Sequence, residues 1–549
     1  MLDPWFRSTF FRKELAHIVA GEPEMEDLRL QAVTDYVATL EPDSGLILYG
    51  CGSLSASLAR EHGDLLGRVG AVFVTTAEPH QSDFHGLPWL PVGTACRSIR
   101  PQTVILMSAT YADEMRGNVE DMADDNIVTL MDIIKGLGDE VFRIAVERIK
   151  ATAEHLTEEI RTAFAEPTVC YAASFDFNPP FYAVIRGQGF RLVALSMRVH
   201  HRPPFIKEIG PAFGDYAINI YGFAAFRIML AHLVAICPFR VVVISHLGFE
   251  LFYNQLISAA CISPLIVWHD SFLHLLCQDD NLQAFYEHQL HMDLAGIETV
   301  EAAIYQQAIG VITRYPLPFM EDYRNRHNHP YDLLQIFPPM LPLPSAPARK
   351  FLTSKRRLRL VFATGIYAQD EDQSPAYSWS RDDIVEAAEI LDRQGADLTV
   401  YNYRDRGEGD FNDLEAYDQS HPYFTYHGAV SKTELLRLLP CFDFAWMCRK
   451  FDNYAGHFSR QHVNTSLFTY MEAGVPVVIS RELEFMAELV EHWFVGFCVG
   501  RDQWNQVAEL CRKFDYQKYQ KNVEQVHAWL SEERLGREVG RFIARLTRK

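Results

Sequence analysis

The chain alternates between two hydrophobic patterns along most of its length. Short runs of β-branched and other apolar residues, typical of buried strands, are followed by turn residues and then by segments with apolar positions at helical spacing. The strand-like runs lie at 46–49, 69–74, 103–108, 168–172, 191–195, 240–245, 265–268, 310–313, 358–363, 398–401, 423–426, 442–446 and 476–479. This alternation predicts an α/β protein with mainly parallel sheets.

Changes in the pattern divide the chain into four parts. Residues 1–118 form an N-terminal Rossmann-like domain, and residues 119–165, which show no strand pattern, form a helical connector. Residues 166–345 and 346–549 form two further α/β lobes, the last with C-terminal helices. The proline-rich stretch FPPMLPLPSAPA at 337–348 between them is expected to be a stiff linker, since proline continues neither helix nor sheet.

The connector carries one apolar stripe. Its members recur at alternating steps of four and three: Phe142, Val146, Ile149, Ala153, Leu156, Ile160 and Ala163. The spacing predicts a long helix with one buried face. Two interpretations remain: a connector packed on its own chain, which we favour because alanines weaken a coiled-coil seam, and a homodimer through residues 142–163.

Composition narrows the class of protein. Apolar residues make up 48 % and aromatic residues 12 % of the 549 positions, as expected for a globular chain with several cores. The formal charge of −20 argues against a nucleic-acid partner. The basic strip at 355–359 is interpreted as a solvated segment leading into a strand, with phosphate binding as the alternative.

The cysteines and the lengths of the apolar runs indicate the cellular compartment of the protein. Ten scattered cysteines show no zinc-site spacing, which fits reduced thiols in the cytoplasm. The first residues lack the apolar core of a signal peptide, and nowhere do 18 apolar residues run together. We expect a cytoplasmic protein, with attachment at the inner face of the membrane as an alternative.

The loops after the C-terminal strands hold the candidate donor-site residues. Ligands bind beyond the carboxyl ends of strands in open parallel sheets, and clefts between lobes favour small molecules. Gly365 would let the backbone approach a ligand, although turn geometry explains a glycine there equally well. Arg449 and Lys450 would neutralise a pyrophosphate leaving group unless they are a surface pair. Asn464 and Ser466 precede a helix, which suits either capping or phosphate contact.

Two other loops carry candidate chemistry. His269 and Asp270 follow a strand of the 166–345 lobe, where they could bind or deprotonate a sugar hydroxyl. In the first domain, Gly50-Cys51-Gly52 is half of a dinucleotide-binding fingerprint, with Glu78 near the ribose position. Nucleotide binding there stands against a purely structural or docking domain.

Taken together, residues 166–500 resemble the GT-B glycosyltransferases of the bacterial group 1 type. The motifs that carry the resemblance are YHGAVS at 426–431, ELL at 434–436, CFDF at 441–444 and, above all, LFTYMEAGVPVV at 467–478; WHD at 268–270 and VIT at 311–313 match the acceptor lobe. The resemblance implies transfer of a sugar from a nucleotide-sugar, with retention and without an obligatory metal. It implies no further cofactor, and it leaves open whether the acceptor is a glycan, a lipid-linked sugar or a protein.

The sequence departs from that family at two positions. Thr469 stands where the family usually has a glutamate that holds the donor ribose, and Ser466 where relatives often have a lysine. Glu472, one helical turn after Thr469, is the candidate substitute. These departures favour a non-catalytic binding or scaffold protein as the alternative, and a nucleotide-sugar epimerase on the same fold is another.

Overall fold

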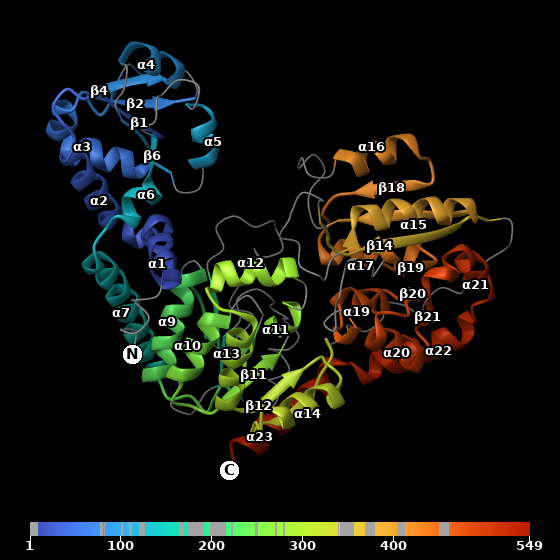
Figure 1. The fold of residues 1–549 in the computed structure, drawn as a ribbon. Helices are drawn as coiled ribbons and strands as arrows, with labels where there is room; N and C mark the ends of the chain where they lie inside the picture. Colours follow the sequence, from blue (N-terminus) through green and yellow to red (C-terminus); the bar gives the residue numbers. More distant parts are fainter. Residues whose placement is uncertain are drawn as a thin grey trace. The chain divides into compact units, whose positions relative to one another are not determined.

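The computed structural model describes most of the chain (Figure 1). The described residues are 9–76, 79, 81, 83–99, 103–108, 112–119, 127–163, 169–172, 190–197, 216–220, 223–246, 251–269, 272–277, 280–338, 340, 356–367, 379–402, 412–449 and 460–548. They form two compact units, each described below by itself. The first comprises Met1–Glu159, Met197–His200 and Asn219–Leu233, and the second comprises Ile160–Ser196, His201–Ile218 and Val234–Lys549.

The first unit is built on a six-stranded sheet of order β3-β4-β2-β1-β5-β6, in which β3 alone is antiparallel to its neighbour. Its strands are β1 (Leu46–Tyr49), β2 (Ala71–Thr75), β3 (Asp83–Phe84), β4 (Leu87–Pro91), β5 (Thr103–Leu106) and β6 (Ile127–Thr129). The helices are α1 (Thr9–Gly21), α2 (Glu26–Ala38), α3 (Ser53–Arg68), α4 (Val92–Ile99), α5 (Ala112–Gly117), α6 (Leu130–Lys135) and α7 (Asp139–Ala163), whose last turn passes into the second unit. The central strands are buried, as parallel strands covered on both faces must be.

Helix α7 buries the apolar stripe that the sequence predicts. Its described members, Phe142, Val146, Ile149, Ala153, Leu156 and Ile160, are all at most 5 % exposed within the single chain. Part of α9 (Phe223–Ile236) belongs to the same unit, and Glu154 of α7 lies 3.8 Å from the Nε2 atom of His232 on it. The described side chains of the stripe are therefore buried within one chain, as the connector interpretation predicts.

The second unit contains two lobes, each built on its own sheet. The sheet of the middle lobe has the order β13-β12-β11-β10-β7-β8-β9, and its registered pairs from β13 to β8 are parallel. The strands are β7 (Val169–Ala172), β8 (Leu192–Met197), β9 (Tyr216–Ile220), β10 (Val241–His246), β11 (Leu265–His269), β12 (Ala308–Thr313) and β13 (Asp332–Gln335). Helices α10 (Leu251–Ala260), α11 (Leu273–Leu276), α12 (Asp280–Leu290), α13 (Leu294–Gln307) and α14 (Leu317–Arg326) belong to the same lobe.

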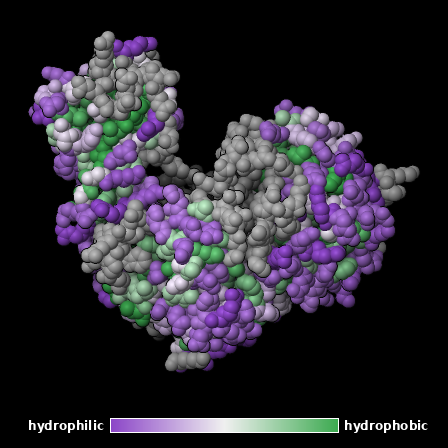
Figure 2. All heavy atoms as spheres, viewed as in Figure 1, coloured by the Kyte–Doolittle hydropathy of each residue, from purple (hydrophilic) through white to green (hydrophobic). Residues whose placement is uncertain are grey.

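The C-terminal lobe has an entirely parallel sheet of order β18-β17-β14-β19-β20-β21. Its strands are β14 (Leu358–Ala363), β17 (Ala396–Tyr401), β18 (Phe424–His427), β19 (Phe444–Met447), β20 (Val477–Ser480) and β21 (Gly496–Val499), beside a small pair β15 (Ile366–Tyr367) and β16 (Trp379–Ser380). The helices are α15 (Arg381–Arg393), α16 (Asn412–Ser420), α17 (Lys432–Leu438), α19 (Thr465–Glu472), α20 (Glu484–Trp493), α21 (Val507–Lys513) and α22 (Tyr516–Trp529). Figure 2 shows mainly hydrophilic residues on the visible face around α20 and α22, opposite the apolar sides that these helices bury.

The last helix, α23 (Glu532–Leu546), packs on the middle lobe. Its apolar face contacts the sheet formed by β10, β11 and β12, through Leu535, Val539, Phe542, Ile543 and Leu546 against Val241, Val243, Ile266 and Ile312. Where the chain crosses between the lobes, the backbone N–H of Met340 donates to the carbonyl of Leu530 at 2.9 Å. The two crossing segments are thus joined to each other.

The predicted fold class is confirmed. The second unit contains two lobes with Rossmann-like parallel sheets, and a smaller Rossmann-like sheet precedes them. The domain boundaries stay a prediction. Strand β6 falls in the segment where the sequence shows no strand pattern, so that expectation is wrong. The sequence also missed β3, β4, β9, β13 and β21, as well as the small pair β15 and β16.

The structure also bears on the predictions for the basic strip and for membrane-spanning segments. In the basic strip, Arg356 pairs with Asp443, and Arg357 pairs with both Asp392 and Asp397 at 2.8 and 2.6 Å. These arginines support the amino ends of the strands instead of offering cations to a phosphate. Across the residues that the structure covers, no helix combines the length and the apolar character needed to cross a bilayer; attachment at a membrane face stays a prediction.

Candidate active site

The candidate donor-site residues of the C-terminal lobe lie at the carboxyl edge of its sheet. Strands β14 and β19 are parallel neighbours, with Leu360 opposite Phe444. The segments that follow them, with Gly365 after β14 and Arg449 after β19, therefore leave the sheet at the same edge. Helix α19 joins this edge, because the Tyr470 hydroxyl accepts a hydrogen bond from the backbone N–H of Ala363 at 2.6 Å.

The Gly365 loop is held by a buried amide that the sequence analysis missed. The N–H of Ile366 donates to Oδ1 of Asn402 at 3.2 Å, and Nδ2 of Asn402 donates to the hydroxyl of Tyr426 at 3.0 Å. Asn402 is 3 % exposed and directly follows β17. The sequence signal that could have identified Asn402 is a polar residue at the carboxyl end of a buried strand. In the structure, its side chain fixes the Gly365 loop and does not lie on the surface.

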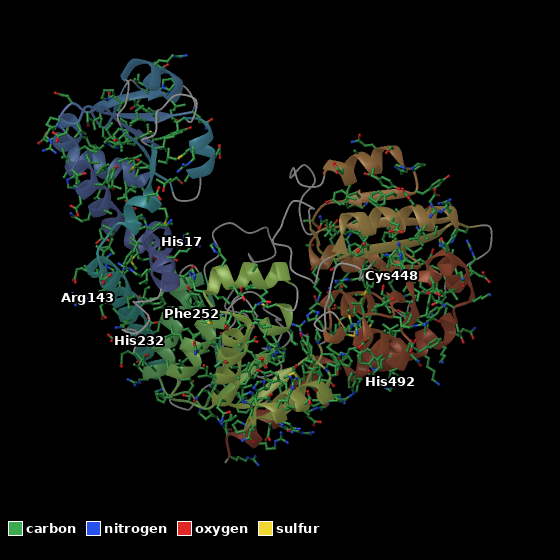
Figure 3. All side chains as sticks on the ribbon, in the orientation of Figure 1. His17, Arg143, His232, Phe252, Cys448 and His492 are labelled. Atoms are coloured by element: carbon green, nitrogen blue, oxygen red, sulfur yellow. The ribbon has the colours of Figure 1, made fainter. Side chains whose placement is uncertain are left out.

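Arg449 is buried at the end of β19, with 3 % of its surface exposed. Its backbone N–H donates to Oγ of Ser480 at 2.9 Å, and the same hydroxyl donates to the Arg449 carbonyl at 3.3 Å. These two hydrogen bonds fix the ends of β19 and β20 together. The neighbouring residue Cys448 is labelled in Figure 3, and burial raises the pKa of its thiol well above the ordinary value. A buried guanidinium at a sheet edge interacts far more strongly with an anion than a surface one does.

Asn464 and Ser466 are brought together at the start of α19. Oδ1 of Asn464 accepts from the N–H and from the hydroxyl of Ser466, at 2.9 and 2.8 Å. Asn464 therefore caps the helix, as one of the two interpretations of this motif predicts. Contact of either residue with a phosphate stays a prediction.

The two residues considered for the donor ribose differ in their surroundings. Thr469 is half-buried, and its hydroxyl donates to the carbonyl of Thr465 at 3.3 Å within the helix. Glu472 is 5 % exposed, and its carboxylate lies 3.2 Å from Nζ of Lys432, the first residue of α17. The candidate substitute carboxylate thus forms an ion pair within the lobe.

In the middle lobe, His269 is the last residue of β11 and is fully buried. Its Nδ1 atom is hydrogen-bonded to the hydroxyl of Tyr305 on α13. The rings of Phe272 and Tyr315 lie with their centroids 3.9 and 4.9 Å from the imidazole. Asp270, Lys450 and Glu78 lie outside the described residues, so their predicted roles stay predictions.

A buried carboxylate that the sequence analysis did not single out lies one helical turn before Tyr305 on α13. Glu301, fully buried on α13, accepts hydrogen bonds from the backbone N–H groups of Leu273 and His274. Its carboxylate also pairs with the His274 ring. Glu301 thereby anchors the first residues of α11.

In the first unit, the turn that follows β1 requires glycine at position 50. Gly50 has a φ of +116°, which other residues rarely adopt, and a Cβ there would lie 3.2 Å from the Met115 side chain. Burial raises the pKa of Cys51 to about 11, so this thiol is a poor nucleophile near neutral pH. Nucleotide binding by this turn stays a hypothesis.

No group of three or more His, Cys, Asp or Glu side chains within the described ranges is arranged to hold a metal ion. The chemistry that the described residues offer is a buried cation, a capped helix start and a backbone loop at one sheet edge, with a buried histidine at the end of a strand in the other lobe. Whether the sheet edge of the C-terminal lobe binds a phosphorylated ligand stays a prediction.

The fold and the family match define a class of protein. Residues 395–539 match the family described as "Glucosyltransferase 3-like, C-terminal domain". The chain thus carries a glycosyltransferase C-terminal domain on an architecture with two parallel α/β lobes, and the predicted resemblance to GT-B glycosyltransferases is confirmed at this level.

Sequence and structure comparisons add little beyond this class. No curated protein matches the chain in sequence. Among solved structures, Anabaena Alr3699/HepE in complex with UDP-glucose is 12 % identical with a TM-score of 0.44, over 68 % of this chain and 98 % of that one. An α,α-trehalose-phosphate synthase (UDP-forming) from Burkholderia xenovorans is 9 % identical with a TM-score of 0.43, over 68 % and 100 %. A putative UDP-N-acetylglucosamine 2-epimerase from Listeria monocytogenes is 11 % identical with a TM-score of 0.39, over 68 % and 95 %. At such scores the likenesses say nothing about substrate or reaction.

Proposed function

We propose that this chain transfers a sugar from a nucleotide-sugar to a glycan, lipid-linked or protein acceptor, with retention of configuration and without an obligatory metal ion. The observation that carries the proposal is the burial of Arg449 at the carboxyl edge of the sheet, within the segment that matches a glucosyltransferase domain. A cation placed there would stabilise the charge that accumulates on the departing diphosphate. Arg449 would then supply positive charge of the kind that a bound metal ion can supply at a phosphoryl group.

In this proposal the C-terminal lobe binds the nucleotide. The Gly365 loop, which Asn402 holds in place, would pass close to the ligand, and the start of α19 would face its phosphates. The middle lobe would present the acceptor near His269 and Asp270. A homodimer through residues 142–163 is not included, because the described side chains of that stripe are already buried within one chain.

A non-catalytic binding protein is the second candidate function, and the surroundings of Glu472 favour it. This carboxylate is 5 % exposed and paired with Lys432, so its use for a donor ribose would require that pair to open. Ser466 is likewise engaged with Asn464. A binding protein would retain the diphosphate site and lack turnover.

Cleavage of the donor distinguishes these functions. We would incubate stoichiometric protein with each nucleotide-sugar in turn, so that water can serve as acceptor, and follow release of the nucleoside diphosphate by phosphorus NMR and the anomer formed by proton NMR. We expect release from one donor, with the anomeric configuration retained and the rate unchanged by EDTA. Arg449→Ala should slow release by about 10²- to 10³-fold, as loss of one transition-state contact does elsewhere, and Arg437→Ala, which removes an exposed cation from the same lobe, should not.

Each contrary outcome overturns a defined part of the proposal. Loss of release in EDTA would overturn metal independence, and an inverted anomer would overturn retention. Binding without release from any donor would favour the binding protein. An altered sugar on an intact nucleotide-sugar would identify an epimerase.

A further inference from the structure

The hydrogen bond between His269 and Tyr305 bears on what the histidine can do. A histidine at the end of β11 could either deprotonate a sugar hydroxyl or donate a hydrogen bond to an oxygen atom. The choice depends on which ring nitrogen carries the proton, and that is set by the partner of the other nitrogen. In this structure the partner of Nδ1 is the phenol of Tyr305.

Tyr305 is a rigid, neutral partner. It is fully buried on α13, and the rings of Phe272 and Tyr323 lie with their centroids 5.3 and 5.8 Å from its own. Burial first, and then the charges of nearby groups, raises the pKa of Tyr305 well above the ordinary value, so its hydroxyl keeps its proton. The phenol therefore remains able to donate a hydrogen bond near neutral pH.

The direction of the hydrogen bond follows from the acidities of the two groups. A neutral phenol is a stronger acid than a neutral imidazole N–H, and an imidazole nitrogen is a much stronger base than a phenol oxygen. The bond is therefore more stable with the Tyr305 O–H donating to Nδ1 than with Nδ1–H donating to the phenol. The ring proton of neutral His269 then lies on Nε2.

We propose that Tyr305 is a positioning residue that fixes neutral His269 as the Nε2-protonated tautomer, so that Nε2 can donate a hydrogen bond and cannot accept a proton as a general base. This inference rests on the proposed function for the oxygen that Nε2 would meet, a sugar or phosphate oxygen, which must reach a side chain that is fully buried without it. It selects binding over deprotonation for His269, and no proton leaves the substrate through this side chain.

The tautomer is measured directly by NMR. Trp268–His269 is the only Trp–His step in the chain, so tryptophan labelled with ¹³C at the carbonyl and histidine labelled with ¹³C and ¹⁵N identify the His269 signals without a variant. Two-bond ¹H–¹⁵N correlations then report which ring nitrogen is protonated. We expect the Nε2–H pattern in the wild-type protein, and a mixture of tautomers or the Nδ1–H pattern in Tyr305→Phe.

Tyr331→Phe is the matched control. Tyr331 is a buried tyrosine of the same cluster, 1 % exposed, and its hydroxyl has no hydrogen-bond partner among the described residues. The Tyr331→Phe substitution should leave the His269 spectrum unchanged. An Nδ1–H pattern in the wild-type protein overturns the inference even if Tyr305→Phe fails to fold, and so does a spectrum that Tyr305→Phe leaves unchanged.

The outcome is separable from the proposed function. The tautomer is read without any nucleotide, so a chain that cleaves no donor would overturn the transferase while the His269–Tyr305 result stands. Conversely, active transfer together with an Nδ1–H histidine would overturn only the inference.

Discussion

At the scale of single residues, the middle lobe depends on buried polar groups with defined partners. Glu301 satisfies two backbone N–H groups and the His274 ring in a region where its carboxylate is fully buried. A buried charge contributes only when all its partners are present, and removing one side of such a pair leaves the others without compensation. This residue therefore supports the first residues of α11.

We expect Glu301→Ala to destabilise the middle lobe by about 3–5 kcal/mol, because it leaves His274 and two backbone donors buried without their acceptor. The matched control is Glu298→Ala on the same helix. Glu298 is 38 % exposed and lies 3.2 Å from His327, so its loss should cost at most about 1 kcal/mol. Scanning calorimetry of both variants measures the difference, and equal melting temperatures would contradict the anchoring role.

His329 makes the stability of the lobe depend on pH. Burial first, and then the neighbouring His327, lowers the pKa of His329 to about 4 from an ordinary value of 6.5. Between these two values the unfolded chain binds a proton that the folded lobe does not, so stability falls as pH drops from 6.5 towards 4.

His329→Gln should reduce this loss of stability on acidification. The control is His155→Gln on α7, where the side chain is 73 % exposed, and it should keep the wild-type pH profile. Melting temperatures from pH 7 to pH 4 give the comparison. A wild-type pH slope in His329→Gln would contradict the assignment.

The predictability of single residues depended on how local their partners are. Asn464 and Ser466 could be found because a cap and its helix are neighbours in sequence, and the structure joins them. Asn402 and Glu301 could not, since their partners lie 36 and up to 28 residues away along the chain. Thr469 and Glu472 were placed on one helix correctly, but the pair between Glu472 and Lys432 is a long-range contact that no spacing reveals.

At the scale of elements, α23 shows how a helix pattern can be clear while its destination is hidden. Its apolar face repeats at helical spacing, yet it packs on strands more than 200 residues earlier in the chain. Gly310 on β12 permits this close approach. A Cβ there would lie 2.5 Å from Cδ1 of Leu546 and 2.9 Å from the Phe542 ring.

Gly310→Ala should therefore destabilise the protein by about 1–3 kcal/mol through overpacking. The second substitution Leu546→Ala should recover part of this loss by making room, which tests the contact itself. Gly63→Ala in α3, where a Cβ would meet nothing within 4 Å, is the tolerated control. The melting temperatures of the three variants test this prediction. An unchanged melting temperature in Gly310→Ala would contradict the packing of α23 on β12.

Several of the strands that the sequence missed lie at sheet edges. β13 lies at a sheet edge with half-buried residues, β6 has three half-buried residues, and β21 begins with glycine. These strands carry no continuous run of buried apolar residues, which is the pattern by which a sequence reveals a strand covered on both faces. Strand β4 lies inside its sheet and was missed as well, because its residues are only half-buried or exposed. Central strands such as β10 and β20 are buried on both faces and were therefore readable from sequence.

At the scale of the whole molecule, the three parallel sheets were predictable because parallel sheets impose a repeated pattern of buried strand, turn and helix. The function of each sheet was not, because function depends on which side chains meet at the carboxyl edge. The C-terminal lobe supplies a buried Arg449, a fixed Gly365 loop and a capped α19 at that edge. These features define the central claim, that this lobe binds the diphosphate of a nucleotide-sugar.

Calorimetric titration of the full chain with the common nucleoside diphosphates tests that claim most directly. We expect that one of them binds, that Arg449→Ala weakens its affinity about tenfold or more through loss of a charged hydrogen bond, and that Arg437→Ala leaves the affinity unchanged. Binding that survives Arg449→Ala unchanged, or no binding by any nucleoside diphosphate, would contradict it.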